Sequence, residues 1–344
     1  MKAVVFERFG RPDVLELRDL PEPAVRPDEV LVEVRACGLN HLDLWVREGL
    51  PGFEPEMPHV LGSDIVGVVA KVGEVVRHVS PGQKVLVLPT LSCGVCAACL
   101  AGDDQLCRSY DVLGRRRNGG YAERVAVPGV NCLPYPENLS WEEAAAVPLV
   151  FLTAWHMLVG RARVRPGDDV LVVGAGSGVG SAAIQVARLH GARVIATAGS
   201  AAKLERAKAL GAHETIDHSA QDLAAETRRL TGKKGADVVI EHVGGHVFES
   251  AVAALARDGR LVTCGATIGS QVSLNINLLF GRHLTLLGSW MGRRSELVEV
   301  LKHVSDGRLK PVVDSVLPLA QAQQAHERIE RREHFGKVVL KVTS

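Results

Sequence analysis

Apolar and polar residues alternate along much of the first part of the chain. Residues 29–35 alternate with a period of two, which is the pattern of a β-strand with one buried face. Similar apolar runs predict further strands at 65–72, 84–88 and 121–127. Residues 1–135 are therefore predicted to form a β-rich region.

The pattern changes after Pro136 into alternating helices and strands. Ser140 is predicted to cap a helix that runs towards Leu158, because Glu143 three residues later completes a capping box. Strands are then predicted at 170–173, 193–197, 237–240, 260–264 and 284–287, and helices at 180–189, 201–210 and 295–306. This alternation implies an α/β fold with a parallel sheet and helices on both faces. A last strand, at 337–342, is expected to return to the N-terminal region.

Length and charge narrow the class of protein. A chain of 344 residues is long enough for two domains, each with its own core. The formal net charge of +1 argues against a nucleic-acid partner. The longest mostly apolar run, 144–155, is interrupted by Pro148 and is shorter than the roughly 20 residues of a membrane span. The N-terminus turns polar at Glu7 and lacks a signal-peptide core. We expect a cytoplasmic protein with no membrane partner.

A glycine-rich loop joins the strand at 170–173 to the helix that follows it. The loop residues are Gly174, Ala175, Gly176, Ser177, Gly178, Val179 and Gly180. Small residues let the backbone approach a pyrophosphate, and the helix N-terminus offers N–H groups and its dipole to the anion. The loop lies between a predicted strand and helix, as a dinucleotide site requires, so we predict one at residues 176–180. A glycine-rich turn without a ligand is the alternative.

The next strand indicates which dinucleotide binds. An NAD site usually has an Asp or Glu at the end of this strand, and the residue here is Ala198. Ser200 can donate a hydrogen bond to a 2′-phosphate and Lys203 supplies a cation. We predict NADP, with NAD as the alternative if Lys203 is only a solvated helix residue. His218 follows the third strand and could flank the adenosine phosphate, or be an ordinary surface histidine.

Four of the seven cysteines fall within fifteen residues: Cys93, Cys96, Cys99 and Cys107. In a cytoplasmic chain such a group favours a metal over disulfides. Four thiolates at these spacings can surround one tetrahedral zinc ion. An iron–sulfur cluster is the alternative. In its common sequence motif, three residues separate the third Cys from the fourth, and a Pro follows the fourth. Here seven residues separate Cys99 from Cys107, and Arg108 follows. We predict one structural zinc, closed to substrate.

Together these features resemble the medium-chain dehydrogenase/reductase superfamily, which contains the zinc-type alcohol dehydrogenases and the quinone oxidoreductases. The segments 36–43, 61–67 and 336–340 carry the resemblance as well. It implies a GroES-like β-rich catalytic domain and a Rossmann domain with a doubly wound parallel sheet. The GroES-like domain is expected to comprise residues 1–135 and 290–344, with its zinc lobe at about 90–110. The Rossmann domain is expected to comprise residues 136–289. The resemblance also implies a homodimer or homotetramer, and places Thr153 and Val179 beside the nicotinamide.

The chain departs from the alcohol dehydrogenases at their catalytic zinc. The resemblance places the three ligand positions at Asn40, Ser63 and Leu149, none of which is a good soft ligand. Leu42 replaces the hydroxyl residue that would relay the substrate proton. A different zinc site is the alternative; its ligands would come from Cys37, His41, His59 and Asp64.

Zinc-free quinone oxidoreductases carry Gly-x-Asn and an Asp three residues later, which matches Gly38, Asn40 and Asp43. We therefore expect hydride transfer from NADPH to a small quinone or α,β-unsaturated carbonyl without catalytic zinc. Asn40 is the candidate donor to the substrate or to the nicotinamide ribose. Asp43 is expected to fix the loop, with a local cap as the simpler reading. An alcohol or aldehyde dehydrogenase and a non-catalytic NADPH-binding protein are the alternatives.

Overall fold

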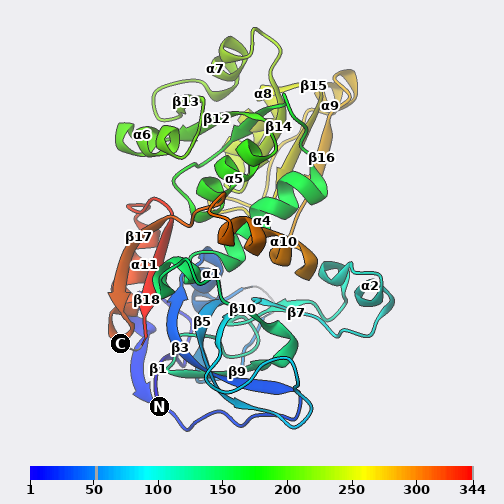
Figure 1. The fold of residues 1–344 in the computed structure, drawn as a ribbon. Helices are drawn as coiled ribbons and strands as arrows, with labels where there is room; N and C mark the ends of the chain where they lie inside the picture. Colours follow the sequence, from blue (N-terminus) through cyan, green and yellow to red (C-terminus); the bar gives the residue numbers. More distant parts are fainter. Residues whose placement is uncertain (51–52, 343–344) are drawn as a thin grey trace. The chain divides into compact units, whose positions relative to one another are not determined.

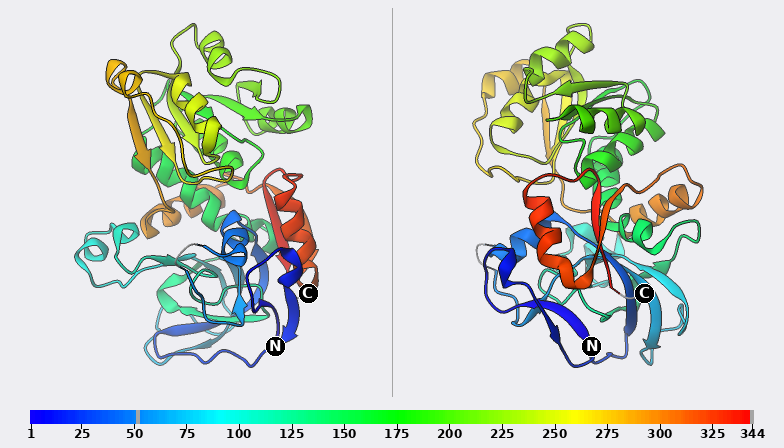
Figure 2. Two further views of the ribbon diagram at one scale, coloured as in Figure 1. Left: turned by 180° about the vertical axis from the view of Figure 1, so that it is seen from behind. Right: turned by 90° about the vertical axis from the view of Figure 1, so that its left-hand side faces the viewer.

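The computed structural model describes residues 1–50 and 53–342. Contacts within the chain divide it into two compact units. The first consists of Met1–Leu149 and Arg293–Ser344, and the second of Val150–Gly292. Figures 1 and 2 show the elements of each unit along the chain.

A seven-stranded sheet forms the centre of the first unit, in the order β10-β6-β5-β3-β18-β17, with β9 also paired to β3. Its strands are β3 (Glu29–Gly38), β5 (Asp64–Val72), β6 (Lys84–Val87), β9 (Arg124–Pro128), β10 (Cys132–Pro134), β17 (Val313–Pro318) and β18 (Lys337–Lys341). The strands predicted from alternation are present, except that β9 begins three residues after the predicted start at 121. The alternation has its expected cause, because Val30, Val32 and Val34 of β3 all point into one apolar core.

The C-terminal strand β18 returns to the N-terminal region, as predicted. It pairs antiparallel with β3, and Leu340 lies opposite Cys37. Figure 1 shows β18, in red, beside the blue N-terminal strands. This pairing brings the residue at the start of β18, Lys337, to the end of β3.

Smaller elements complete the first unit. A three-stranded sheet contains β1 (Lys2–Phe6), β2 (Glu16–Asp19) and β4 (His59–Val60). The short strands β7 (Thr90–Leu91) and β8 (Asp111–Val112) lie on either side of the cysteine segment with its one-turn helix α2 (Ala97–Leu100). The longer helices are α1 (His41–Glu48), α10 (Arg294–Ser305) and α11 (Ala322–Glu330).

The helix predicted from Ser140 towards Leu158 is divided in the structure. Ser140 caps α3 (Trp141–Ala145) with the expected capping box, but the helix stops before Pro148, which lacks an N–H and begins a separate helix, α4 (Pro148–Trp155). A π-helical turn, His156–Arg161, follows α4. Because α3 packs on β3, β5 and β18, residues 136–149 group with the first unit, whereas the sequence placed them in the nucleotide domain.

The second unit contains a six-stranded sheet in the order β13-β12-β11-β14-β15-β16, in which every pair is parallel. Its strands are β11 (Asp169–Val172), β12 (Arg193–Ala198), β13 (Glu214–Asp217), β14 (Ala236–Glu241), β15 (Leu255–Thr263) and β16 (Thr285–Gly288). Its helices after α4 are α5 (Gly178–Leu189), α6 (Ala201–Ala209), α7 (Leu223–Leu230), α8 (Gly245–Ala254) and α9 (Ile276–Gly281). This strand order is that of a doubly wound dinucleotide-binding sheet, whose ligands lie at the carboxyl ends of the strands.

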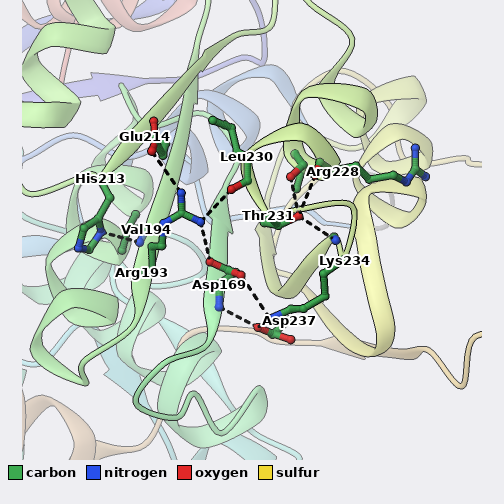
Figure 3. Close-up of polar contacts among 12 residues, drawn as sticks. Asp169, Arg193, Val194, His213, Glu214, Arg228, Leu230, Thr231, Lys234 and Asp237 are labelled. Carbon is green, nitrogen blue, oxygen red and sulfur yellow. Dashed lines mark hydrogen bonds and ion pairs between the residues drawn. The ribbon is translucent and has the colours of Figure 1, made fainter.

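Charged side chains tie together the opposite, amino-terminal ends of these strands (Figure 3). Arg193 at the start of β12 contacts Asp169 of β11 at 3.1 Å and Glu214 of β13 at 3.2 Å. Lys234 lies 2.7 Å from Asp237 of β14 and 3.2 Å from Asp169. These pairs are partly exposed, so each contributes at most about 1 kcal/mol, and their role is to fix the strand register at this end of the sheet.

Within the described residues, the structure contains no helix that is long and apolar enough to cross a membrane.

The close pairing of β3 and β5 requires a glycine at position 67. A Cβ atom there would lie 2.0 Å from the carbonyl oxygen of Glu33. We expect Gly67→Ala to lower the free energy of unfolding by about 1–3 kcal/mol, because the sheet must distort to admit the methyl group. Thermal unfolding of the purified protein measures this. Gly288→Ala is the control, since a Cβ on this strand glycine meets nothing within 4 Å; an equal loss in both variants would contradict the steric explanation.

Candidate functional site

The glycine loop of the second unit is closely packed against the start of α5. Gly174 has a φ of +72°, and a Cβ at Gly180 would lie 2.3 Å from the Gly174 carbonyl oxygen. Ser177 caps α5, since its Oγ accepts a hydrogen bond from the Gly180 N–H at 2.8 Å. The predicted residues 176–180 thus lie at the carboxyl end of β11 and the N-terminus of a twelve-residue helix, where a dinucleotide pyrophosphate could bind.

The sequence did not indicate that His242 would contact this loop. His242 follows β14, and its Nε2 lies 3.0 Å from Ser177 Oγ. A Cβ at Gly174 would meet its ring at 3.0 Å. Burial lowers the pKa of His242, which favours the neutral ring. The neighbouring Glu241 is fully buried and shapes the turn by accepting hydrogen bonds from the Gly244 N–H at 2.7 Å and the Thr263 hydroxyl at 3.0 Å.

The residues predicted to select the dinucleotide gather around the end of β12. A Cβ at Gly176 would meet the Cδ of Lys203 at 3.0 Å and its Nζ at 3.6 Å, so this cation lies over the glycine loop. His218 Nδ1 is 3.1 Å from the Thr197 hydroxyl, beside the last residue of β12, Ala198. Ser200 is the exposed N-cap of α6. Cationic or protonatable groups therefore lie on both sides of this strand end.

The two residues predicted to line the nicotinamide belong to different helices of the second unit. Thr153 lies in α4, is 4% exposed, and its hydroxyl is 3.8 Å from the sulfur of Met291. Val179 is the second residue of α5 and is partly buried. Their contact with a nicotinamide ring stays a prediction.

In the first unit, the ammonium group of Lys337 lies at the centre of a buried polar cluster. Its Nζ donates hydrogen bonds to Asn40 Oδ1 at 2.6 Å, to Asp64 Oδ2 at 2.8 Å and to the carbonyl oxygen of Leu39. Asn40 Nδ2 in turn donates to Asp64 Oδ2 at 3.0 Å. The amide of Asn40 is thereby held with its oxygen towards the ammonium and its nitrogen towards the carboxylate. Nothing in the local sequence around residue 40 signalled Lys337, which lies 297 positions later.

The two other positions of the family's catalytic zinc also have different roles here. Ser63 is fully buried and donates its hydroxyl hydrogen to the Leu113 carbonyl oxygen at 2.7 Å. Leu149 contributes only its backbone N–H, which donates to Asp64 Oδ1 at 2.8 Å. The ligand positions are thus occupied by groups that complete the hydrogen bonding of the unit.

The alternative zinc ligands do not come together. His59 is bound through Nε2 to the Gly114 carbonyl oxygen at 3.1 Å, and its ring packs edge-on against Phe6. Cys37 is fully buried, which raises the pKa of its thiol well above the usual range. Among the described residues, the only group of three or more His, Cys, Asp or Glu side chains close enough to share an ion is the four-cysteine set.

Asp43 links the backbone at Asn40 to the backbone at Gly62. It is the third residue of α1, and its Oδ2 accepts a hydrogen bond from the Asn40 N–H at 2.8 Å, as a helix-capping carboxylate does. Its Oδ1 accepts one from the Gly62 N–H at 3.1 Å. Burial raises the pKa of Asp43 to about 6, although these N–H groups and Lys337 oppose the shift.

The four predicted metal ligands converge in the cysteine lobe. Their sulfur atoms all lie within 4.8 Å of one another, with 3.9 Å between Cys93 and Cys99 and 3.5 Å between Cys96 and Cys99. Four sulfurs about 2.3 Å from a tetrahedral zinc are separated by roughly 3.8 Å, so the set fits this ion. Backbone N–H groups of Val95 and Cys96 lower the pKa of Cys93 to about 6, which favours its thiolate, whereas desolvation and the Cys96 side chain raise the pKa of Cys99 to about 11. The lobe's larger apolar side chains, Val95, Leu100 and Leu106, are 68–76% exposed and cannot form a core.

Comparison with known proteins matches both units. The family model for the alcohol dehydrogenase GroES-like domain matches residues 26–137, and that for the zinc-binding dehydrogenase matches residues 178–306. An NAD-dependent alcohol dehydrogenase of Sulfolobus acidocaldarius is 34% identical, covering 100% of both chains. The quinone oxidoreductase of Rattus norvegicus is 30% identical, covering 99% of this chain and 97% of its own.

Solved structures agree with these relatives. A structure described as an NAD-dependent alcohol dehydrogenase is 53% identical, with a TM-score of 0.97 and 100% of both chains covered. The crotonyl-CoA carboxylase/reductase AntE, in complex with NADP, is 28% identical, with a TM-score of 0.93, covering 99% of this chain and 94% of its own. The expected fold class is confirmed: a GroES-like domain and a Rossmann domain with a parallel sheet. With relatives matched over the full length of the chain and a nucleotide-binding sheet in the second unit, this chain belongs to the medium-chain dehydrogenase/reductase superfamily of NAD(P)-dependent oxidoreductases.

Proposed function

We propose that this enzyme transfers hydride from NADPH to a quinone or an α,β-unsaturated carbonyl compound without a catalytic metal. The observation that carries the proposal is the position of Lys337, whose ammonium lies between Asn40 Oδ1 and Asp64 Oδ2. Both oxygen atoms already accept a hydrogen bond from the Lys337 ammonium, and the charge of this ammonium would repel a divalent metal ion bound beside it. Ser63 and Leu149 supply no ligand in its place.

The chemistry of the substrate agrees with such a pocket. Interconversion of an alcohol and a carbonyl concentrates negative charge on one oxygen, which a Lewis acid stabilises by several kcal/mol. Hydride addition to an enone or quinone gives an enolate or hydroquinone anion, whose delocalised charge a few hydrogen-bond donors can hold. The cofactor supplies the hydride when it is bound, and water can supply the proton. Asn40 is the proposed donor through the second hydrogen of its amide nitrogen, which has only a long 3.5 Å contact with the Gly38 carbonyl oxygen, while Asp64 holds the first and Lys337 holds the amide oxygen.

Alcohol or aldehyde oxidation is the second candidate. The 53% identical structure and the Sulfolobus relative are both described as alcohol dehydrogenases. The rat relative is a quinone oxidoreductase, and AntE acts on crotonyl-CoA, which contains an α,β-unsaturated carbonyl group. A non-catalytic NADPH-binding protein would show no turnover with either class, so a screen of quinones, enones, alcohols and aldehydes distinguishes the three possibilities.

The preference for NADP rests on the end of β12. Ala198 has no carboxylate to repel a 2′-phosphate, and Lys203 and His218 lie close to the same strand end. The names of the 53% identical structure and of two archaeal relatives specify NAD, so a direct comparison of both cofactors tests this point. The remaining proposed contacts are the loop residues Gly176, Ser177, Gly178, Val179 and Gly180 with the cofactor, Ser200 with the phosphate, and Thr153 with the nicotinamide.

We assign the four-cysteine lobe to one structural zinc. The sulfur spacing fits a tetrahedral ion, and the lobe has exposed apolar side chains in place of a core. Four ligands leave no open coordination position on the zinc, so we propose that this ion does not contact the substrate. A cytoplasmic location and a homodimer or homotetramer stay predictions.

The zinc assignment predicts about one zinc ion per chain in purified protein. Cys96→Ser should lose the ion and destabilise the lobe, because metal binding contributes to its folding. Elemental analysis and limited proteolysis measure the two effects. Cys132→Ser is the matched control, since this buried cysteine lies outside the cluster and its replacement should leave the zinc bound. Two tightly bound zinc ions per chain would refute the assignment of a single site.

The cofactor assignment predicts that Lys203→Ala weakens NADPH binding by roughly ten- to a hundredfold, because one charge-assisted contact is lost, while NADH binding hardly changes. Fluorescence titration with both cofactors measures the two affinities. Lys208→Ala on the same helix is the control, since Lys208 pairs with the exposed Glu205 at 3.0 Å. Equal losses for both cofactors would give Lys203 a purely structural role, and tighter binding of NADH by the unmodified enzyme would overturn the NADP preference.

The reaction assignment predicts faster reduction of enones or quinones than oxidation of simple alcohols. Asn40→Ala should lower kcat/KM for an enone by roughly ten- to a thousandfold if its amide stabilises the developing enolate. The affinity for NADPH should change little, and steady-state kinetics with a parallel binding titration separate the two.

Asn131→Ala is the control for the loss of a buried amide. Asn131 donates to the carbonyl oxygens of Leu88 and Thr90 at 2.7 Å, outside the Lys337 cluster, so its replacement should affect stability and leave kcat/KM unchanged. Activity of the wild type confined to alcohols and aldehydes, together with a metal bound at Asp64, would favour the alcohol-dehydrogenase reading instead.

A further inference from the structure

A continuous chain of hydrogen-bonded, buried polar side chains runs from Arg47 through His326 and Tyr121 to Asp43. Arg47, on α1, lies 3.2 Å through Nη1 from His326 Nδ1, on α11. His326 Nε2 lies 3.2 Å from the hydroxyl of Tyr121, and this hydroxyl lies 3.3 Å from Asp43 Oδ2. Arg47, Tyr121 and His326 are all completely buried. No sequence pattern indicates this hydrogen-bonded chain, because its members come from three distant segments.

The hydrogen bonds of this chain have one direction. An arginine side chain only donates, so Nδ1 of His326 must accept from Arg47. Burial and the charge of Arg47 lower the pKa of His326 to about 3, so its ring is neutral and carries its hydrogen on Nε2. Nε2 therefore donates to the oxygen of Tyr121, which leaves the tyrosine hydrogen for Asp43. Every donor in the chain points from the cation of Arg47 towards the carboxylate.

The outer end of the chain is anchored firmly. The guanidinium of Arg47 donates to the Gly10 carbonyl oxygen at 3.0 Å, to Glu48 at 2.6 Å and to Glu330 at 2.7 Å. Because an arginine side chain stays protonated in proteins, protons cannot pass through it to the solvent. The chain is suited to orienting Asp43, and it cannot deliver protons from the surface.

The inner end of the chain links the two segments that carry Asn40 and Asp64. Asp43 connects the backbone at Asn40 to the backbone at Gly62, and these two segments carry Asn40 and Asp64. We infer that Arg47, His326 and Tyr121 are positioning residues, which act through Asp43 to hold Asn40 and Asp64 in the arrangement that the reaction needs. The inference deepens the proposed function, and it rests on that proposal in assigning the reaction to this pocket.

The surroundings of Asp43 make its ionisation a measurable consequence. The charged or titratable groups around it are Cys37 of β3, Asp64 of β5, Lys337 of β18, Tyr121, His326 of α11 and Arg47 of α1. With a pKa of about 6, Asp43 is ionised at neutral pH and becomes protonated as the pH falls through that value. Protonation would remove an acceptor from the Asn40 N–H or the Gly62 N–H. Removing the Tyr121 hydroxyl takes away a donor to the carboxylate and should raise its pKa further.

The test compares Tyr121→Phe with the wild type, using whichever substrate class the wild type converts fastest. We expect kcat/KM to fall roughly three- to tenfold, a modest loss because 3.3 Å is long for an O–H···O bond. The acid limb of the pH profile of kcat/KM should move to higher pH by about half a unit or more. The affinity for the nicotinamide cofactor should be unchanged.

Tyr135→Phe is the matched control, because this hydroxyl also donates one hydrogen bond, to the Leu139 carbonyl oxygen at 2.8 Å, and has no contact with Asp43. It should leave the acid limb in place. His326→Leu should reproduce the effect of Tyr121→Phe, and His326→Gln, which can still donate to Tyr121, should recover part of the loss.

An acid limb at the same pH in Tyr121→Phe and the wild type, in protein with an unchanged melting temperature, would overturn the inference. Equal shifts of the acid limb in Tyr121→Phe and Tyr135→Phe would also overturn it. If the wild type converts only alcohols, the proposed reaction fails, yet the shift of the acid limb is still measurable with an alcohol substrate. A failure of the proposed reaction can therefore be distinguished from a failure of the inference about the positioning residues.

Discussion

The ion pair between Lys337 and Asp64 is the interaction on which the buried polar cluster of the first unit depends. Removing an ammonium and a carboxylate from water costs several kcal/mol each, and hydrogen bonds must offset this cost. Lys337 has acceptors in Asp64, Asn40 and the Leu39 carbonyl group. Asp64 accepts from Lys337, Asn40 and the Leu149 N–H. The pair is thus fully satisfied only when the ends of β3, β5 and β18 meet in one arrangement.

This requirement links distant parts of the chain. The pairing of β18 with β3 places Lys337 beside the backbone of residues 38–40, and a Cβ at Gly38 would meet its side chain at 3.2 Å. The cap of α1 by Asp43 then continues the hydrogen bonding from Asn40 to Gly62. Strand pairing, helix capping and the buried ion pair therefore all hold the same few residues in place.

Features that depend on neighbours in sequence were predictable. The alternation at 29–35 identified β3, the glycine loop identified the β11–α5 turn, and the cysteine spacing identified the lobe, because each is contained in one short segment. Pro148 also acts locally: the pattern around it predicts one helix, but a proline at that position divides the residues into α3 and α4.

Contacts made by distant residues were not predictable in this way. The sequence pattern places Lys337 in a terminal strand and nothing more, and its contact with Asn40 follows from the antiparallel register of β18 and β3. His326 and Tyr121 meet because α11 packs beside the segment before β9, and neither stands in a recognisable motif. His242 reaches the glycine loop because β14 and β11 are neighbours in the parallel sheet. A single sequence lists these residues, but it does not show the strand register and helix packing that bring their side chains into contact.

The distribution of charge in the pocket bears on which substrates it can serve. Lys337 lies 2.8 Å from Asp64, so at the distance of a substrate the two charges act largely as a dipole, whose field falls off faster than that of a single ion. Such a pair cannot replace a divalent metal in stabilising a localised alkoxide, which needs a strong field at one oxygen atom. It can orient an amide donor, as it does for Asn40, and oriented donors are sufficient for an anion whose charge is spread over several atoms. These electrostatics are the physical reason for proposing conjugated carbonyl compounds and quinones, in preference to simple alcohols, as the substrates.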